Sequence, residues 1–213
     1  MRHLALSLIL MCFAVSVSST HAQASKTAGL GTPARGEKIH IAGIPNAGKV
    51  SEQLYRGAQP RIETIVKLRE MGITTIVDLR AEDAAMRDQE KKQAETLGIH
   101  FVSIPVGGWS NPTNNEIAQF LSLFDEQSQE RVFIHCHFGE DRAGVFVATY
   151  RMAIQKWTAE QALREMYYFG FNGFWHPQMI SFVRNFPVRV TSVPALAKFS
   201  HPTPPVSTII SPN

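Results

Sequence analysis

The sequence predicts an α/β fold with a central, mostly parallel sheet flanked by helices. Three short runs, 73–80, 99–106 and 131–136, are rich in β-branched and apolar residues and are typical of strands. Segments with apolar residues at helical spacing lie between and after these runs. Because strands and helices alternate along the chain, we expect the strands to form a sheet with helices packed around it.

The first half of the expected core alternates helix and strand twice. Residues 62–71 carry apolar side chains near helical spacing, and Gly72 is expected to end that helix. ITTIVDLR at 73–80 predicts a strand, residues 82–97 predict a mostly exposed, charged helix, and IHFVSIPV at 99–106 predicts the next strand.

The second half carries the strongest local signals. Thr113 and Glu116 have the spacing of a capping box, directly before an apolar helical face. RVFIHC at 131–136 is an apolar run typical of a central strand that is covered on both sides. A helix is expected over 143–154.

Two more helices are expected before the C-terminal segment. Thr158 and Gln161 repeat the capping-box spacing. Residues 177–185 are amphipathic, and we expect this helix to end before Pro187 because proline lacks the N–H that a helix interior needs.

One core domain is expected, at residues 38–188. The 213 residues are 44% hydrophobic and 18% charged, which is ordinary for a single globular domain. Residues 25–37 are small, polar and Gly/Pro-containing, which predicts a linker. Residues 189–213 are proline-rich and predict an irregular tail.

Residues 1–24 are typical of an export signal. They have a positive start, an apolar stretch over 4–17 and a small-x-small end at 22–24, so cleavage would leave Ser25 first. An uncleaved membrane anchor is the alternative, but the stretch is shorter than the roughly 20 apolar residues that a span needs. We therefore expect an exported protein, periplasmic or secreted, with no stable membrane insertion after cleavage.

The net charge argues against nucleic-acid binding. The full chain carries 21 basic and 18 acidic residues, and loss of Arg2 with the signal leaves 20 minus 18, or +2. This excess is small and dispersed, so no nucleic-acid partner is expected, whereas anionic small substrates are compatible with it. The oligomeric state is left open.

The cysteine count makes Cys136 notable. Cys12 would leave with the signal, so the mature chain would keep one thiol and no internal disulfide. A single thiol in an oxidising compartment is either a buried structural residue or a group with a chemical role.

The residues around Cys136 favour the chemical role. VFIHCHFGEDRAGVFVATYR at 132–151 places the thiol where a buried strand ends and a helix begins, and ligands gather at the carboxyl ends of strands in α/β sheets. The N-terminus of that helix would favour an anion there, including a thiolate. Gly139 allows a tight loop, and Arg142 can hold two oxygens of a tetrahedral anion. The pattern predicts a phosphate site with a nucleophile at its floor.

HCHFGEDR, after an apolar strand and before a helix, resembles the signature of the protein tyrosine phosphatase superfamily. Residues 50–186 resemble its small bacterial dual-specificity phosphatases, with a partial likeness to cysteine phytases. By this resemblance the core is a cysteine-dependent phosphatase domain in which Cys136 attacks phosphorus and Arg142 binds phosphate. His135 helps to set the thiolate. The resemblance implies no cofactor and no metal.

The same resemblance places the substrate at the loop between Cys136 and Arg142. Its backbone amides would hold the phosphate oxygens, and the expected substrate contacts come from the loop and the residue after it: His137, Phe138, Gly139, Glu140 and Ala143. The expected reaction is hydrolysis of a phosphomonoester through a phosphocysteine intermediate. The expected substrate is a phosphorylated small molecule or a phosphoprotein, with phosphotyrosine and inositol polyphosphates both open.

Two departures from the family pattern concern the chemistry. The segment 107–114, which corresponds to the family's acid loop, contains no carboxylate, so Asp141 is the candidate general acid or an orienting group for Arg142. Ala143 stands where the family has Ser or Thr, which predicts slow breakdown of the phosphoenzyme. A catalytically silent phosphate-binding module is therefore the alternative function. Arg56 and Arg80 are expected to surround the mouth or to form surface ion pairs.

Overall fold

The computed structural model describes residues 34–125 and 127–200, so the expected export signal, 1–24, lies outside the described part. Within it, the strands are β1 (Glu37–Lys38), β2 (Gly48–Lys49), β3 (Leu54–Ala58), β4 (Thr75–Arg80), β5 (His100–Val106) and β6 (Val132–Cys136). The α-helices are α1 (Ile65–Glu70), α2 (Ala84–Thr96), α3 (Asn114–Leu121), α4 (Asp141–Ala153), α5 (Ala159–Tyr168) and α6 (Pro177–Ser192). Three short 3-10 helices are η1 (Ile62–Thr64), η2 (Ser122–Phe124) and η3 (Pro194–Phe199).

The strands form one sheet in the order β1-β2-β3-β6-β4-β5. Four neighbouring strands, β3, β6, β4 and β5, run parallel, while β1 and β2 pair antiparallel at one edge. The predicted α/β class with a mostly parallel sheet is confirmed. β6 lies between β3 and β4 and is wholly buried, as its apolar sequence predicted.

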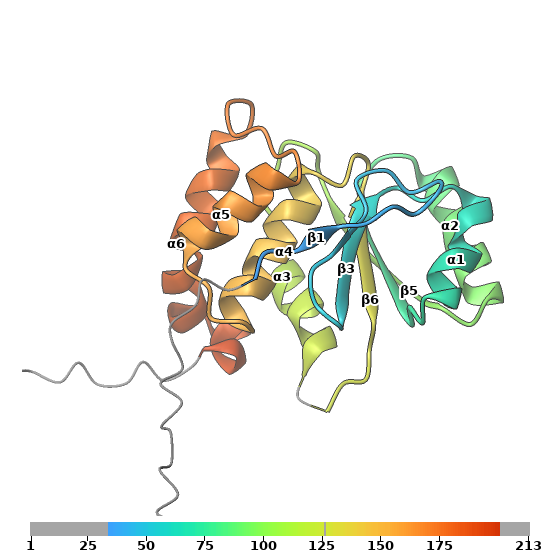
Figure 1. The fold of residues 1–213 in the computed structure, drawn as a ribbon. Helices are drawn as coiled ribbons and strands as arrows, with labels where there is room; N and C mark the ends of the chain where they lie inside the picture. The colour runs from blue at the N-terminus through green and yellow to red at the C-terminus, as the bar shows by residue number, and fades with distance from the viewer. Residues whose placement is uncertain (1–33, 126, 201–213) are drawn as a thin grey trace, which may run out of the picture. The chain divides into compact units, whose positions relative to one another are not determined.

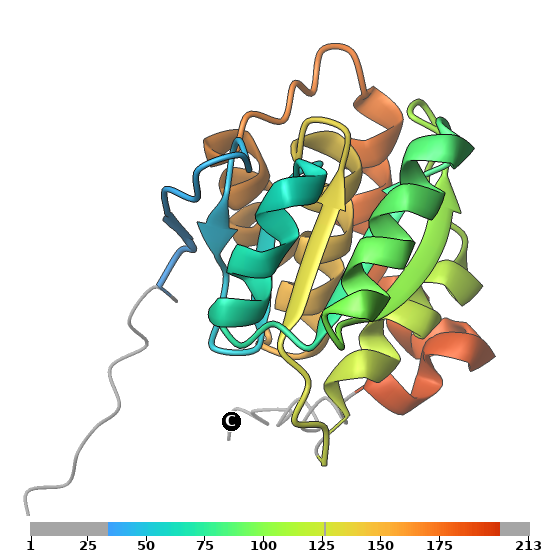
Figure 2. The same ribbon diagram turned by 90° about the vertical axis from the view of Figure 1, so that its right-hand side faces the viewer.

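Helices cover both faces of the sheet (Figures 1 and 2). α1 and α2 pack on one face, over a cluster that includes Ile76 and Phe133. α3, α4, α5 and α6 pack on the other face, over a larger cluster that includes Ile134 and Cys136. Alternate residues of β6 therefore enter different cores, because successive side chains of a strand point to opposite faces.

Both predicted capping boxes are present. Thr113 accepts a hydrogen bond from the backbone of Glu116, whose side chain bonds back to the backbone of Thr113, and Thr158 and Gln161 form the same pair. Each box satisfies backbone donors that a helix start otherwise leaves unpaired. Contiguous residues sufficed to predict these helix starts.

The predicted end of the last helix is wrong. α6 continues through Pro187 to Ser192, and η3 follows it, with Leu196 and Phe199 buried in the larger core. Packing of the side chains around the proline outweighs the backbone hydrogen bond that proline removes. Ordered packing thus extends past 188, into the segment that the sequence predicted as irregular. None of the described helices is both long and apolar enough to cross a bilayer.

Candidate active site

Cys136 lies at the carboxyl end of β6, beside Ala58 at the end of β3. The chain then curls through a short loop and enters α4 at Asp141. We call residues 136–142 the phosphate loop. A pocket of 180 Å³ opens over it, lined by Gly108, Trp109, Cys136, Phe138, Asp141, Arg142 and His176. The thiol, 3% exposed as a residue, forms part of the floor.

The backbone carbonyls of the phosphate loop are bonded on its outer side. Asn46 Nδ2 donates to the carbonyls of residues 138 and 139 at 3.5 and 3.1 Å, and Arg56 Nη2 donates to those of residues 139 and 140 at 2.7 and 3.3 Å. The backbone N–H of Gln59 donates to the carbonyl of residue 137 at 3.3 Å. In a planar trans peptide the N–H points opposite to the C=O. The amides of residues 138–141 are therefore directed inward, as donors for an anion above the thiol.

Gly139 is the residue that lets the loop curl this closely against β3. Its φ is +71°, a conformation that other residues rarely adopt. A Cβ at this position would lie 2.3 Å from the carbonyl carbon of Gly57, so the backbone itself leaves no room. Both constraints exclude a side chain here.

Arg56 supports the phosphate loop from its outer side and does not lie at the opening of the pocket. Its side chain is fully buried, and its guanidinium lies 4.3 Å above the ring of Phe169. Burial lowers the pKa of Arg56 to about 10, with the charges of Glu165 and Glu140 opposing this shift. The expectation that Arg56 and Arg80 line the mouth or form surface ion pairs is wrong, because both side chains are fully buried.

Arg142 is held in place by Glu82, from the turn after β4. The two side chains form a bidentate pair, with N···O distances of 2.8 and 2.7 Å, and Nη1 also donates to the carbonyl of Val106 at 3.0 Å. Burial is the largest single influence and opposes the charge of Arg142, but the bond to Glu82 and the charges of Cys136, Glu82 and Asp78 together outweigh it and raise the pKa of Arg142. The same bond lowers the pKa of Glu82 to about 2. The pair stays ionised at neutral pH.

The pairing with Glu82 leaves one edge of Arg142 for a ligand. Among the described residues, none accepts a hydrogen bond from Nε, and Nη2 donates only to Glu82. The Nε–H and the second Nη2–H point along one edge of the planar guanidinium, a spacing that matches two phosphate oxygens. Glu82 thus orients Arg142 and need not be displaced by phosphate.

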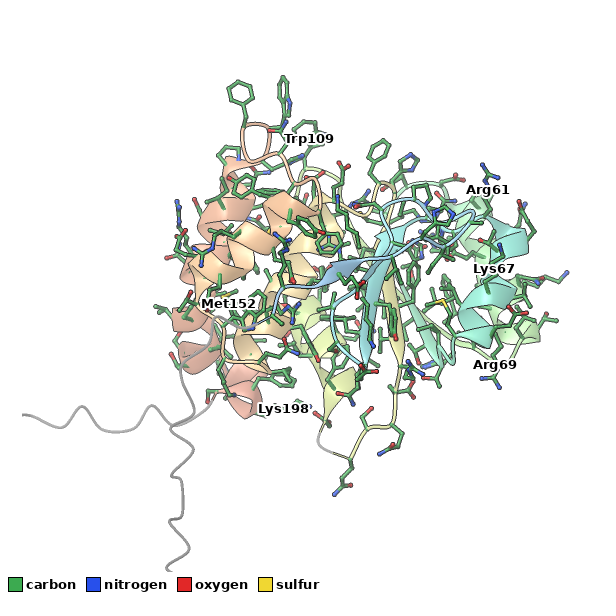
Figure 3. The ribbon with its side chains drawn as sticks, in the orientation of Figure 1. Arg61, Lys67, Arg69, Trp109, Met152 and Lys198 are labelled. Atoms are coloured by element: carbon green, nitrogen blue, oxygen red, sulfur yellow. The ribbon has the colours of Figure 1, made fainter. Side chains whose placement is uncertain are left out.

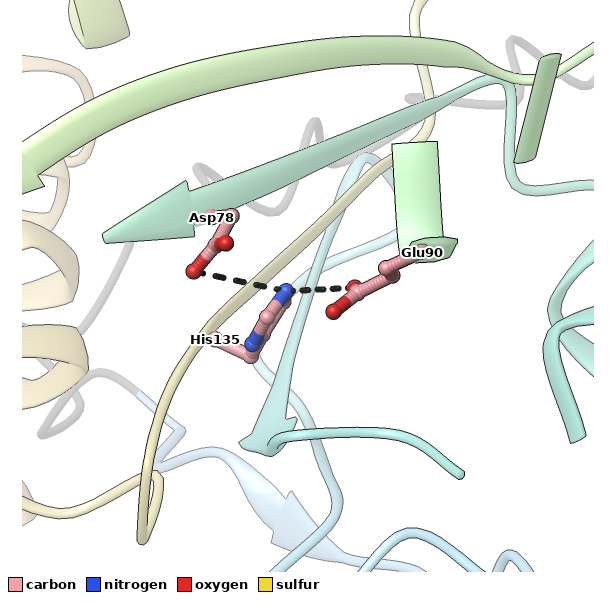
Figure 4. A group of neighbouring side chains, drawn as sticks. All are labelled: Asp78, Glu90 and His135. Carbon is pink, nitrogen blue, oxygen red and sulfur yellow. Dashed lines mark ion pairs between the residues drawn. The ribbon is translucent and has the colours of Figure 1, made fainter. Parts of the chain in front are cut away.

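His135 points to the face of the sheet opposite Cys136. Figure 4 shows its imidazole between Glu90 and Asp78. Nε2 lies 2.8 Å from Oε1 of Glu90 and 3.9 Å from Oδ1 of Asp78. The shorter approach is an ion-pair distance without the alignment of a hydrogen bond. Burial lowers the pKa of His135, but the charges of Glu90 and Asp78 outweigh burial and raise it. A cationic His135 is therefore favoured beneath the loop.

Arg80 completes this network. It donates to both carboxylate oxygens of Asp78, at 2.9 and 2.8 Å, and to Glu90 at 2.6 Å. All four side chains are fully buried. Two carboxylates thus face one guanidinium and one imidazolium, so the charges balance when His135 is protonated.

The same carboxylates raise the question of a metal ion. Within residues 34–125 and 127–200, Asp78, Glu90 and His135 form the one group whose ligand atoms lie close enough together, all within 4.8 Å. Arg80 already engages both carboxylates, and a divalent cation would place a further positive charge beside its guanidinium. The group fits a closed ion-pair network better than a metal centre.

The remaining residues predicted from the sequence fall into three places. Phe138 and Asp141 line the pocket with Cys136 and Arg142. His137 and Glu140 line a neighbouring pocket of 440 Å³, on the side of Arg61. Burial and the charge of Asp141 raise the pKa of Glu140. Ala143 is fully buried in the core that contains Cys136 and offers no polar group.

Three residues of the site, Asn46, Glu82 and His176, were not predicted from the sequence. Asn46 has a φ of +51°, a region that Asn adopts more easily than most residues, but only the fold brings it to the loop. Glu82 was predicted only as one of the charged residues of an exposed helix. It lies 60 residues from Arg142 along the chain, so the sequence does not indicate their contact. His176 has no periodicity or motif around it, although its position before Pro177 is a helix-start signal.

Residues 43–196 match a protein family described as DSP-PTPase phosphatase fused to NAD+ kinase. The dual specificity protein phosphatase TpbA of Pseudomonas aeruginosa strain PAO1 is 28% identical over 152 residues, which cover 70% of this chain and 64% of TpbA. The chain therefore spans less than two thirds of that relative's length.

Two solved structures show the same fold. TpbA from P. aeruginosa in complex with pTyr is 21% identical, with a TM-score of 0.57, and the match covers 72% of this chain and 95% of that chain. The core catalytic domain of the PP-IP phosphatase SIW14 from S. cerevisiae is 22% identical, with a TM-score of 0.56, and covers 70% and 92%.

The raised pKa of His135 predicts that the protein loses stability as the pH rises. The folded chain binds this proton more tightly than the unfolded chain, where the ordinary pKa is 6.5. The stabilisation is therefore complete below about pH 6.5 and is lost as the pH rises through the higher folded pKa. Urea unfolding followed between about pH 6 and pH 9 should show this loss.

Glu90→Gln should flatten that pH dependence, because the main charge that raises the pKa of His135 is removed. It should also lower the free energy of unfolding by about 3–5 kcal/mol, since two buried cations lose an anion. Glu95→Gln, at an exposed position on the same helix, is the control and should change neither. An unaltered pH dependence in Glu90→Gln would contradict this account of His135.

Proposed function

The chain belongs to the family of DSP-PTPase phosphatases fused to NAD+ kinase, and from this premise we propose that it is a cysteine-dependent phosphomonoester hydrolase. One observation supports the proposal most: the carbonyls of residues 137–140 are all bonded on the outer side of the loop. This arrangement directs successive amides at one point above a thiol. Such a ring of N–H donors fits the oxygens of a phosphoryl group.

The reaction follows from the groups around that point. The Cys136 thiolate attacks phosphorus while the bond to the leaving oxygen breaks, and that oxygen takes up a proton. The amides of residues 138–141 and the free edge of Arg142 hold the three remaining oxygens. Water then attacks the phosphocysteine, the S–P bond breaks, and phosphate leaves with the thiolate restored. The N-terminus of α4 stabilises negative charge throughout.

The walls of the pocket favour an aromatic phosphate ester. Trp109, Phe138 and Trp175 are all more than half exposed. Trp109 and Phe138 line the pocket over the phosphate loop, and all three line an adjoining pocket of 480 Å³ that shares Asp141 with it. Figure 3 shows Trp109 at the end of the protein toward which β6 runs. Exposed aromatic side chains beside a phosphate pocket provide faces on which a phenyl ring can stack. We propose phosphotyrosine as the preferred substrate.

The charges near the pocket support the same choice. Glu140 and Asp141 belong to the phosphate loop, Glu82 pairs with its Arg142, and these carboxylates repel further phosphates. Lys38 and Arg61 line a pocket of 580 Å³ that includes neither Cys136 nor Arg142, and Arg61 also lines the pocket of 440 Å³ beside His137. In Figure 3 Arg61 lies on the side of α1 and α2, away from Trp109. An inositol polyphosphate would have to span these two regions.

Comparison of substrates tests this choice. We expect a higher kcat/KM for a phosphotyrosine peptide than for an inositol polyphosphate. Trp175→Ala should lower the peptide value about 2- to 10-fold, the range expected for loss of one aromatic contact. Phe174→Ala is the matched control, because Phe174 is exposed but lines neither pocket over Asp141. Preference for the inositol phosphate, unaffected by Trp175→Ala, would refute the proposal.

A silent phosphate-binding module is the second candidate. Ala143 favours it, because a buried methyl group cannot donate a hydrogen bond to the departing thiolate. The missing carboxylate at residues 107–114 favours it too. The two functions differ in whether the thiol ever attacks phosphorus.

Burst kinetics with p-nitrophenyl phosphate separate the two. We expect about one equivalent of rapid phenolate release, followed by slower turnover as the phosphocysteine breaks down. Cys136→Ser should abolish the burst yet keep binding of inorganic phosphate, since the amides and Arg142 remain. Absence of any phenolate release by the wild-type protein would exclude the enzyme and leave the binding module.

We also propose that the protein is exported, to the periplasm or beyond. The positive start, apolar stretch and small-x-small end of residues 1–24 support this. Mass spectrometry of the protein from its native cells should find Ser25 as the first residue. If all of the protein is found in the cytoplasm with its N-terminus uncleaved, export is excluded.

A further inference from the structure

Expulsion of an alkoxide or phenoxide requires a proton donor near the leaving oxygen. If the proposed function is accepted, that donor must face the pocket above Cys136. Among the residues that line this pocket, Asp141 is the one carboxylic acid. Its side chain is about one quarter exposed, at the first turn of α4.

His176 approaches Asp141 from the opposite wall. It is the residue before the first turn of α6, and its side chain is only 9% exposed. Nε2 lies 3.5 Å from Oδ2 of Asp141, an ion-pair distance that is longer than a formed hydrogen bond. Trp109 packs against the imidazole with ring centroids 4.6 Å apart, and Phe171 stacks at 6.3 Å. These contacts fix the plane of the ring.

The buried side of the imidazole settles which nitrogen carries the proton. Nδ1 is buried and has no hydrogen-bond partner among the described residues. A proton on Nδ1 would therefore be an unpaired buried donor, which is costly. A neutral His176 thus carries its proton on Nε2, the nitrogen that faces Oδ2 of Asp141. This leaves Oδ1 as the oxygen that can carry the acidic proton.

We propose that His176 is the positioning residue for Asp141, and that Asp141 replaces the carboxylic acid that residues 107–114 lack. When the S–P bond forms and the P–O bond breaks, the proton on Oδ1 moves to the leaving oxygen. When water attacks the phosphocysteine, its proton returns to Oδ1 and the thiolate is released. His176 keeps its own proton, and its Nε2–H stabilises the transient carboxylate.

Leaving-group dependence tests the pair, because a lost proton donor affects poor leaving groups most. Asp141→Asn should lower kcat/KM, which reports only the steps up to loss of the leaving group, about 10²- to 10⁴-fold for phenyl phosphate and far less for p-nitrophenyl phosphate. His176→Phe keeps an aromatic ring between Trp109 and Phe171 but removes the N–H. It should lower kcat/KM for phenyl phosphate by up to about 10²-fold, as for a misplaced catalytic group, and far less for p-nitrophenyl phosphate.

Rescue distinguishes positioning from mere packing. His176→Gln can place an amide N–H near the position of Nε2 and should restore most of the activity on phenyl phosphate. The double variant of Asp141→Asn and His176→Phe should be no slower than Asp141→Asn alone, because the two residues act as one unit. His100→Phe, at an exposed position on β5, is the control and should behave as wild type.

Other outcomes would overturn the pairing. Equal losses on both esters in His176→Phe, with unchanged melting temperature and phosphate binding, would show that His176 does not serve proton transfer. Failure of His176→Gln to restore activity, or multiplicative losses in the double variant, would do the same. If the wild-type protein shows no burst, the proposed phosphatase function itself is refuted. If it shows a normal burst together with any of the results above, only the proposed role of His176 is refuted.

Discussion

The phosphate loop depends on hydrogen bonds made on its outer side. Asn46, Arg56 and Gln59 hold the carbonyls of residues 137–140, and peptide planarity then fixes where the amides point. Without these donors, the buried carbonyl of Gly139 would be unpaired and the loop could relax toward water. The donors come from β3, the residue after it and the turn before β2, so the neighbouring parallel strand and its hairpin shape the anion site at the end of β6.

Buried charge is the second requirement of this site. Arg142 must be cationic yet accessible on one edge, and Glu82 satisfies the other edge. On the face of the sheet that α1 and α2 cover, the positive charges of Arg80 and protonated His135 balance the negative charges of Asp78 and Glu90. Buried ion pairs contribute little net stability, but loss of one partner is costly. We interpret both sets as fixing geometry: one orients the phosphate-binding guanidinium, and the other anchors the strand that carries the thiol.

Local signals in the sequence predicted much of this fold. The capping boxes at Thr113 and Thr158 and the apolar strand before Cys136 each involve adjacent residues, so the chain's own short-range physics decides them. The loop from Cys136 to Arg142 could be recognised for the same reason. The continuation of α6 through Pro187 could not, because it depends on packing of Leu196 and Phe199 against a core built elsewhere.

The sequence alone determined the α/β class, the family resemblance and the position of the nucleophile and the arginine, since all rest on periodicity or on seven contiguous residues. Only the tertiary structure decided which groups orient them. Asn46, Glu82 and His176 reach the loop from distant segments. Side chains that meet across a fold leave no periodic mark, because their spacing along the chain is set by the lengths of the intervening strands and helices.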